Sequence, residues 1–173
     1  MDQTNLIERI IELYRLEPLL KEGGLFRRTY RSDELIPKNA LPKRYSQDKA
    51  FGTAILYLYT SDPDSFSAMH RLPTDEIYHF YLGDPVEMLL LYPDKGIERV
   101  VLGRDIFNGQ QIQYVVKRGV WQGSRLIEGG HFALVGTTMA PGFDEEDFCG
   151  GERAKLIEMY PSEEMLITKL TRI

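Results

Sequence analysis

Hydrophobic and polar positions follow a helical period at both ends of the chain. Near the N-terminus, apolar residues recur at spacings of three and four, at Leu6, Ile7, Ile10, Ile11, Leu13 and Tyr14. Such a stripe predicts a helix that packs one face against the rest of the protein. We expect helical structure over about residues 3–20, ended by Pro18 and the glycines that follow. A second helical segment is expected over about residues 152–172, where Ser162 can cap a helix.

Between these ends the pattern changes to a period of two, which predicts β-strands. In the first such segment, alternation places Phe26, Arg28 and Tyr30 on one face and Arg27 on the other. From residue 51 to 138, short aromatic and β-branched segments alternate with turns rich in Gly, Pro, Asn and Asp. Strands at this spacing are typical of a sandwich or barrel, and the pattern does not predict the β–α alternation of a Rossmann-type sheet.

A polar stretch over residues 37–49 separates the first predicted strand from the others. Its charged residues are four cations and one acid, namely Lys38, Lys43, Arg44, Lys49 and Asp48. This composition predicts an exposed loop. Loops of this length in compact domains often cover a site or contact a partner.

Length and charge narrow the class of protein. The chain has 173 residues, the size of one ordinary domain, and its formal net charge is −5, which argues against a nucleic-acid partner. No apolar run approaches the roughly 20 residues of a membrane span, and no signal peptide is recognisable, so we expect a cytoplasmic protein without a membrane partner. The single cysteine, Cys149, excludes an intramolecular disulfide.

The stretch around residues 70–83 carries the most chemistry. His70 closes one predicted strand and Glu76 opens the next, so the two side chains are expected to face each other across a barrel mouth. Tyr78 shares the strand parity of Glu76. His79 differs from Glu76 by an odd offset and faces the other way unless a bulge intervenes. The third histidine, His131, follows two glycines in a turn and is expected to be exposed.

Four motifs occur in order along the chain: E-G-G-x-F-x-x-T-Y-R-S at 22–32, D-E-x-Y-H-x-Y-x-G at 75–83, G-x-W-Q at 119–122 and A-P-G-F-D-x-x-D-F at 140–148. Together they resemble a cupin family of undetermined function that is sometimes labelled predicted sugar epimerases. The resemblance implies one all-β cupin domain over 1–173, a double-stranded β-helix (jelly-roll) barrel over about 25–148 with helical segments at both ends. It also implies a homodimer with a small-molecule ligand inside the barrel.

The chain differs from metal-binding cupins at two of the positions that supply metal ligands. Those proteins supply H-x-H, then Glu, then a His from the second motif, whereas Ala68 and Gln122 stand at two of these positions here. His70 and Glu76 alone are fewer than the three protein ligands of a typical catalytic metal. We therefore expect no cofactor. The alternative is a divalent metal held by His70, Glu76 and His79.

Metal-free acid–base chemistry is the other possibility that the resemblance offers. Sugar-nucleotide 3,5-epimerases of the cupin superfamily use a His base oriented by a carboxylate and a Tyr acid. The corresponding catalytic prediction is His70 as base, Asp75 or Glu76 beside it, and Tyr78 as acid. The predicted ligand-binding residues are Arg28, Tyr30, Tyr57, His79, Trp121 and Gln122, with Phe143 and Phe148 as core anchors.

Three hypotheses about function follow. The first is a small-molecule-binding cupin that acts as a metal-free sugar or sugar-nucleotide epimerase or isomerase. The second is a metal-dependent cupin enzyme, such as a dioxygenase or isomerase. The third is a ligand-binding module without catalytic activity.

Overall fold

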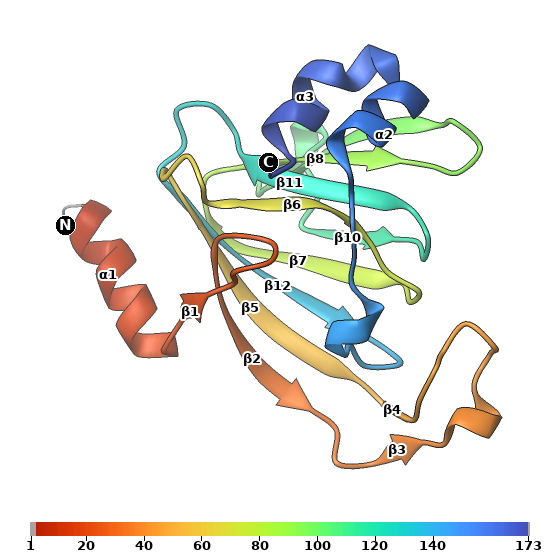
Figure 1. Ribbon diagram of the computed structural model, residues 1–173. Helices are drawn as coiled ribbons and strands as arrows, with labels where there is room; N and C mark the ends of the chain where they lie inside the picture. Colours follow the sequence, from red (N-terminus) through yellow and green to blue (C-terminus); the bar gives the residue numbers. More distant parts are fainter. Residues whose placement is uncertain (1–2, 173) are drawn as a thin grey trace.

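Two antiparallel sheets face each other and enclose the core, as seen in a computed structural model that describes residues 3–172 (Figure 1). The six-stranded sheet has, in spatial order, β1 (Glu17–Pro18), β2 (Leu25–Arg31), β5 (Thr53–Thr60), β12 (Phe132–Met139), β7 (Glu76–Gly83) and β10 (Gln113–Val116). The five-stranded sheet has β13 (Cys149–Gly150), β6 (Phe66–Arg71), β11 (Trp121–Leu126), β8 (Val86–Leu91) and β9 (Ile97–Leu102). A short separate pair joins β3 (Leu35–Ile36) to β4 (Lys49–Ala50). The predicted all-β jelly-roll barrel is confirmed.

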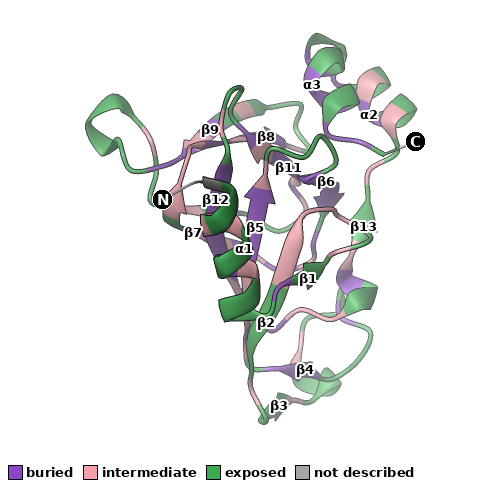
Figure 2. Ribbon diagram, turned by 90° about the vertical axis from the view of Figure 1, so that its left-hand side faces the viewer, coloured by how far each residue is buried: buried purple, intermediate pink, exposed green. Residues whose placement is uncertain are grey.

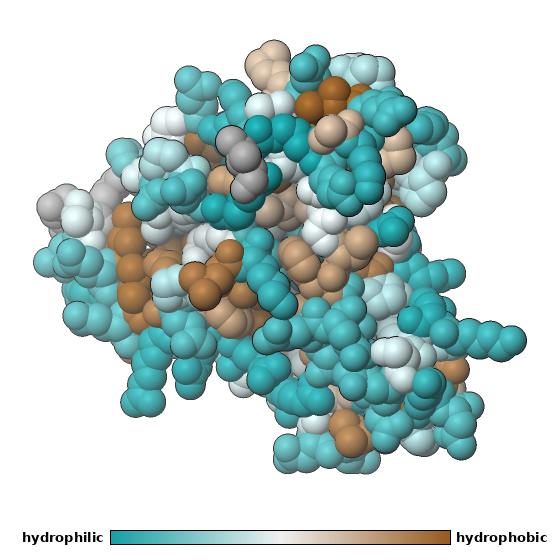
Figure 3. All heavy atoms as spheres, viewed as in Figure 1, coloured by the Kyte–Doolittle hydropathy of each residue, from teal (hydrophilic) through white to brown (hydrophobic). Residues whose placement is uncertain are grey.

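Helix α1 (Gln3–Tyr14) covers part of the outer face of the six-stranded sheet. Its buried residue Ile10 packs with Leu58 of β5 and Leu134 of β12. The helix is shorter than predicted, because the chain reverses at Arg15, whose φ is 51°, and then forms β1. The last turn of the helix is consequently exposed, including Leu13 at 72%. Hydrophobic residues remain visible around α1 and the β1–β2 hairpin on an otherwise mostly hydrophilic face (Figure 3).

The second helical segment forms two short helices, α2 (Arg153–Met159) and α3 (Glu164–Lys169), rather than one. They cover the outer face of the five-stranded sheet, where Leu156 and Ile167 pack with Leu89 and Leu91 of β8. The sheets thus lie between helices at their outer faces, and Figure 2 shows that burial concentrates in the strands. Within the described residues, no helix is long and apolar enough to cross a membrane.

Irregularities in two strands decide which side chains face the barrel. In β2, Arg28 pairs with Ile55 but Tyr30 pairs with Ala54, so Thr29 is an extra residue. This bulge reverses the alternation and leaves Tyr30 on the outer face, 55% exposed. The prediction that Tyr30 shares a face with Phe26 and Arg28 and binds the ligand is therefore wrong.

A second bulge lies in β6. Gln122 of β11 pairs with His70 and Ser124 pairs with Ser67, so β6 has one more residue than β11 between these points. Ser67 and His70 both line the barrel, whereas Ala68 packs in the outer cluster beneath α2 and α3. The inward neighbour of His70 is therefore Ser67 and not position 68.

The stretch over residues 37–49 is only partly the exposed loop that its composition predicts. It contains a 3-10 turn (Lys38–Ala40) and ends in β4. Tyr45 is 2% exposed and the Lys49 side chain is completely buried. Lys49 Nζ lies 2.7 Å from Asp147 Oδ2 and 3.3 Å from Asp144 Oδ2. Its partners come from about a hundred residues further along the chain, so local charge counting does not find them.

Gly83 closes β7 at a close approach of two chain segments. Its φ is 102°, and a Cβ there would collide with the carbonyl oxygen of Phe132. We expect Gly83→Ala to lower the free energy of unfolding by about 3 kcal/mol, from both backbone strain and the clash. Gly109→Ala is the matched control, because Gly109 has φ 89° but no atom within 4 Å, and should lower it by about 1 kcal/mol. Urea unfolding of the two variants measures the difference, and equal losses would contradict a clash at Gly83.

Candidate functional site

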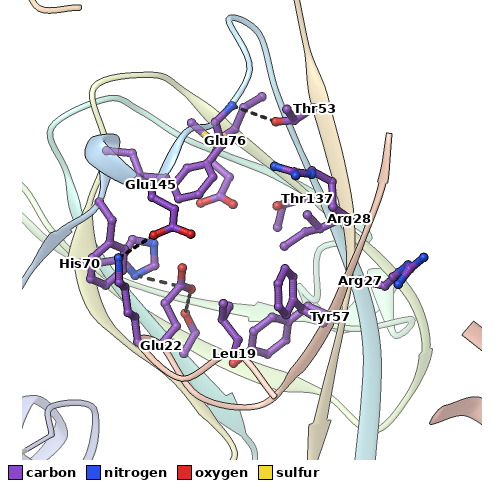
Figure 4. Close-up of a pocket in the computed structure, with 18 of the residues that line it drawn as sticks. Leu19, Glu22, Arg27, Arg28, Thr53, Tyr57, His70, Glu76, Thr137 and Glu145 are labelled. Carbon is purple, nitrogen blue, oxygen red and sulfur yellow. Dashed lines mark hydrogen bonds and ion pairs between the residues drawn. The ribbon is translucent and has the colours of Figure 1, made fainter. Parts of the chain in front are cut away.

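A cavity of about 620 Å³ opens between the two sheets (Figure 4). Strands β2, β5, β7 and β12 form one wall, and β6 faces them from the other sheet. Its aromatic lining consists of Phe26, Tyr57, Tyr59, Tyr78, Phe143 and Phe148. Its polar lining includes Glu22, Arg28, Thr53, Ser67, His70, Glu76, Thr137 and Glu145. Phe143 and Phe148 thus line the cavity, although the sequence predicts them to be core anchors.

His70 lies in the wall of this cavity and is 2% exposed. Its Nδ1 atom is 2.8 Å from the carbonyl oxygen of Ala68, and because a carbonyl only accepts, Nδ1 carries the proton of this bond. The neutral ring then has its lone pair on Nε2. The ring stacks on Phe148, with centroids 5.2 Å apart. Both contacts fix the orientation of the imidazole.

Glu22 is the carboxylate beside His70 Nδ1, and sequence reasoning missed it. Its Oε2 lies 4.0 Å from His70 Nδ1 and accepts a hydrogen bond of 3.2 Å from Ser67 Oγ. The residue lies in the turn between β1 and β2, followed by Gly23 and Gly24, both with positive φ. A Cβ on Gly24 would contact the Tyr57 ring closely, so the glycine allows the turn to pass over this side chain. The E-G-G motif was the signal that could have identified Glu22.

Glu76 and Gln122 form a buried pair, 7% and 2% exposed. Gln122 Nε2 donates to Glu76 Oε2 at 2.8 Å, joining β11 to β7 across the barrel. Burial raises the pKa of Glu76, and the charge of Glu22 acts in the same direction, while His70, Thr137 and Gln122 act against them. Gln122 Oε1 is buried and accepts no hydrogen bond from the described residues. Burial therefore shifts Glu76 toward the protonated carboxyl, and the hydrogen bond from Gln122 opposes this shift. Gln122 itself does not line the cavity, so the structure does not support its predicted contact with a ligand.

Three buried tyrosines face the cavity, and their hydroxyl groups differ in what they bind. Tyr57 donates to the carbonyl oxygen of Gly23 at 2.6 Å, and Tyr59 shares a hydrogen bond of 2.7 Å with Ser124 Oγ. Tyr78 Oη makes no hydrogen bond within the described part of the chain. Burial raises the pKa of all three phenols, so each is protonated at neutral pH. Tyr78 is thus the phenol that remains available to donate to a ligand.

The structure places His79 outside the site. β7 pairs with β12 without a bulge from Glu76 to His79, so strict alternation puts His79 on the outer face. There its Nε2 lies 3.1 Å from Thr138 Oγ1, and its Nδ1 lies 3.2 Å from Gln113 Nε2. The predictions that His79 binds the ligand, or a metal together with His70, are therefore wrong.

Two further predicted residues also lie elsewhere. Trp121 precedes Gln122 in β11 and packs on the outer side of the sheet, with the Arg71 guanidinium 4.7 Å from its ring centroid. Asp75 accepts hydrogen bonds from the Arg118 backbone N–H and from Lys117 Nζ, and the Arg118 bond is the largest cause that lowers its pKa. Held in this way, Asp75 does not orient His70.

The donor groups of the cavity do not fit a tightly held metal ion. Over residues 3–172, no three His, Cys, Asp or Glu side chains come close enough together to form a metal site. The bulge turns position 68 outward, and the second-motif position presents the amide of Gln122 to Glu76 instead of an imidazole. Amide oxygens are weak ligands for transition metals. We therefore derive no chemical step through a metal.

The raised pKa of Glu76 has a consequence for stability. The folded protein keeps this proton to a higher pH than the unfolded chain, so stability falls as the pH rises from about 4.5 through the raised pKa. We expect Glu76→Gln to raise the melting temperature at pH 8 and to change it little at pH 4. Calorimetry across this range measures the effect. Glu145→Gln, at an 85% exposed side chain of the same cavity, is the control. A pH-independent effect of Glu76→Gln would contradict the explanation.

Known proteins match this chain over most of its length. Residues 8–149 match the family described as cupin superfamily (DUF985). The uncharacterized protein YML079W of Saccharomyces cerevisiae is 31% identical over 142 residues, which are 76% of this chain and 70% of that protein. Two solved structures are similar to this chain. Protein SO0799 of Shewanella oneidensis is 29% identical with a TM-score of 0.81, and the match covers 95% of this chain and 96% of that chain. A hypothetical protein of Leishmania major is 28% identical with a TM-score of 0.84, and the match covers 96% of this chain and 98% of that chain.

Proposed function

The chain belongs to the cupin superfamily, in its DUF985 family, and from this we propose that the barrel binds a small polyhydroxylated molecule such as a sugar or sugar nucleotide. The cavity of about 620 Å³ is within the range of small-molecule sites. Its aromatic faces offer stacking surfaces to a ring. Carboxyl, imidazole and hydroxyl groups between them can pair with the hydroxyl groups of a ligand.

For the reaction, we propose epimerisation or isomerisation by proton transfer without a metal. The observation that carries this is the fixed His70 ring, whose Nδ1–H bonds to Ala68 and leaves Nε2 as the base. Nε2 would take a proton from a carbon next to a carbonyl. The C–H electron pair then forms an enolate, whose oxygen accepts a hydrogen bond from Tyr78 Oη. Inversion then requires a proton from solvent to reach the opposite face of that carbon, while Nε2 releases the proton that it took to solvent.

Proton exchange in D₂O tests this proposal. The protein is incubated with keto-sugar nucleotides, ketose phosphates and aldose phosphates, and NMR follows the C–H signals next to the carbonyl. We expect deuterium to replace one such proton in a saturable manner. Saturable binding without exchange would contradict the catalytic part and support a ligand-binding module. Failure of every sugar to bind would contradict the proposed ligand class. The homodimer and the cytoplasmic location stay predictions.

A further inference from the structure

Neighbouring side chains hold three of the four carboxylates that line the cavity, namely Glu22, Glu76 and Glu145 but not Glu17. Among the cations of the lining, Lys21 is paired, whereas the side chains of Arg27 and Arg28 have no partner within the described residues. Glu145 Oε2 forms an ion pair of 3.0 Å with Lys21. Glu22 accepts from Ser67, and Glu76 accepts from Gln122. The Arg28 backbone belongs to the ladder with β5, but its guanidinium group makes no ion pair and no hydrogen bond with any residue of the described range. The cavity wall therefore contains a guanidinium group whose charge the protein does not compensate.

Arg28 is aimed at the cavity by the geometry of β2. It pairs with Ile55 of β5, and both residues line the cavity, just before the bulge at Thr29 reverses the alternation. Figure 4 shows the Arg28 side chain extending toward the cavity near Thr53. The neighbouring Arg27 also contributes to the lining, but its side chain extends away from the centre of the cavity, on the other side of the strand (Figure 4). Two adjacent arginines thus have the same charge but different access to a ligand.

The next inward cation of β2 has an acid partner within the protein. Arg31 pairs with Thr53 in the ladder, and its Nη1 donates to Asp144 Oδ1 at 2.8 Å. On the opposite side of the cavity, His70 lies beside Glu22, so that wall carries a carboxylate. An anionic group of a ligand would be repelled there and attracted to the wall formed by β2.

We propose that the ligand of this pocket carries a carboxylate or phosphate group, which Arg28 binds through two parallel N–H bonds. This rests on the proposed function, since it assigns the charge of the polyhydroxylated ligand. A planar guanidinium matches both anions in geometry, and such charge-assisted pairs are stronger than neutral hydrogen bonds. The anionic group lies at β2 and the hydroxyl-bearing ring extends toward His70 and Glu76. Neutral sugars lack the group that compensates Arg28 and bind more weakly.

Matched ligands and matched variants test this assignment. Calorimetry measures the affinity of the full chain for neutral hexoses, the corresponding hexuronates and the hexose 6-phosphates, together with acetate and inorganic phosphate. For the wild type we expect at least one anionic series to bind about tenfold or more tighter than the neutral hexoses. Arg28→Gln should abolish this preference, and Arg27→Gln should retain it. Comparing the affinities for hexuronates and for hexose 6-phosphates shows whether the site binds a carboxylate or a phosphate group.

Several outcomes would overturn the assignment of Arg28. The first is equal affinity of the wild type for neutral and anionic hexoses. The second is a preference for anionic hexoses that survives Arg28→Gln, and the third is a preference that is lost equally in Arg27→Gln. If no hexose of any charge binds, the sugar proposal fails separately. In that case, binding of acetate or phosphate that is lost in Arg28→Gln and kept in Arg27→Gln still supports an anion site. If neither anion binds in this way, the anion site is overturned as well. Circular dichroism confirms that both variants are folded.

Discussion

Replacing Lys49 with methionine is expected to lower the free energy of unfolding by about 3–5 kcal/mol, the usual loss when one partner of a buried ion pair is removed. The Lys49 side chain has no exposed surface, and that of Asp147 is 5% exposed. Nζ lies 2.8 Å and 2.7 Å from the two Asp147 carboxylate oxygens. Methionine keeps much of the side-chain volume but leaves a buried carboxylate without its cation.

The effect extends to the turn that closes one side of the cavity. Asp147 Oδ2 also accepts a hydrogen bond of 2.9 Å from the Asp144 backbone N–H, and Phe148 follows directly and stacks on His70. Without Lys49, the segment that positions Phe148 loses a side-chain anchor to β4 and keeps the backbone hydrogen bond from Gly142 N–H to the carbonyl oxygen of Ala50. We therefore expect weaker ligand binding in addition to lower stability.

Chemical denaturation and a double variant measure this prediction. Lys38→Met, at an exposed position of the same loop, is the control and should stay within about 0.5 kcal/mol of the wild type. Combining Lys49→Met with Asp147→Asn removes the uncompensated charge and should recover part of the loss. A Lys49→Met variant as stable as the control would show that the buried pair contributes nothing. Additive losses in the double variant would show that the two groups do not interact.

Where a strand is regular, the sequence predicts which of its side chains share a face. β7 is regular from Glu76 to Phe80, so the faces on which Glu76, Tyr78 and His79 lie could be predicted from their spacing alone. β11 was harder to recognise as a strand, because its residues Trp121–Leu126 include a glycine and no β-branched side chain. Its place in the sheet comes from pairing with β6 and β8, which no local pattern encodes.

Bulges and distant partners explain the remaining errors. One extra residue in β2 moved Tyr30 outward, and one in β6 brought Ser67 inward in place of Ala68. Such insertions depend on the pairing of two strands, so counting along one strand does not detect them. Glu22 was missed because its neighbour His70 is 48 positions away and they meet only through the hairpin turn. The sequence therefore identified one member of the His70–Glu22 pair and not the other.

If the proposed function is correct, His70→Asn should slow deuterium exchange into the substrate by about 10²–10⁴-fold, the usual contribution of a general base. Asparagine can still donate a hydrogen bond but has no basic nitrogen, so the substitution removes the base and keeps a polar side chain at this position. Ligand affinity should change far less than the exchange rate, because Arg28 and the aromatic wall remain. The exchange rate at saturating ligand, and separately the dissociation constant, measure these two effects.

His79→Asn is the matched control, since it makes the same substitution at a histidine on the outer face of β7. It should leave both the exchange rate and the affinity unchanged. Exchange at the wild-type rate in His70→Asn would exclude His70 as the base and make Glu76, which also lines the cavity, the next candidate. Equal losses in the two variants would mean that a general disturbance of the barrel, and not the removal of a base, slows the reaction. Loss in His70→Asn alone would assign the proton transfer to the inner face of β6, where the ring is fixed between Ala68, Glu22 and Phe148.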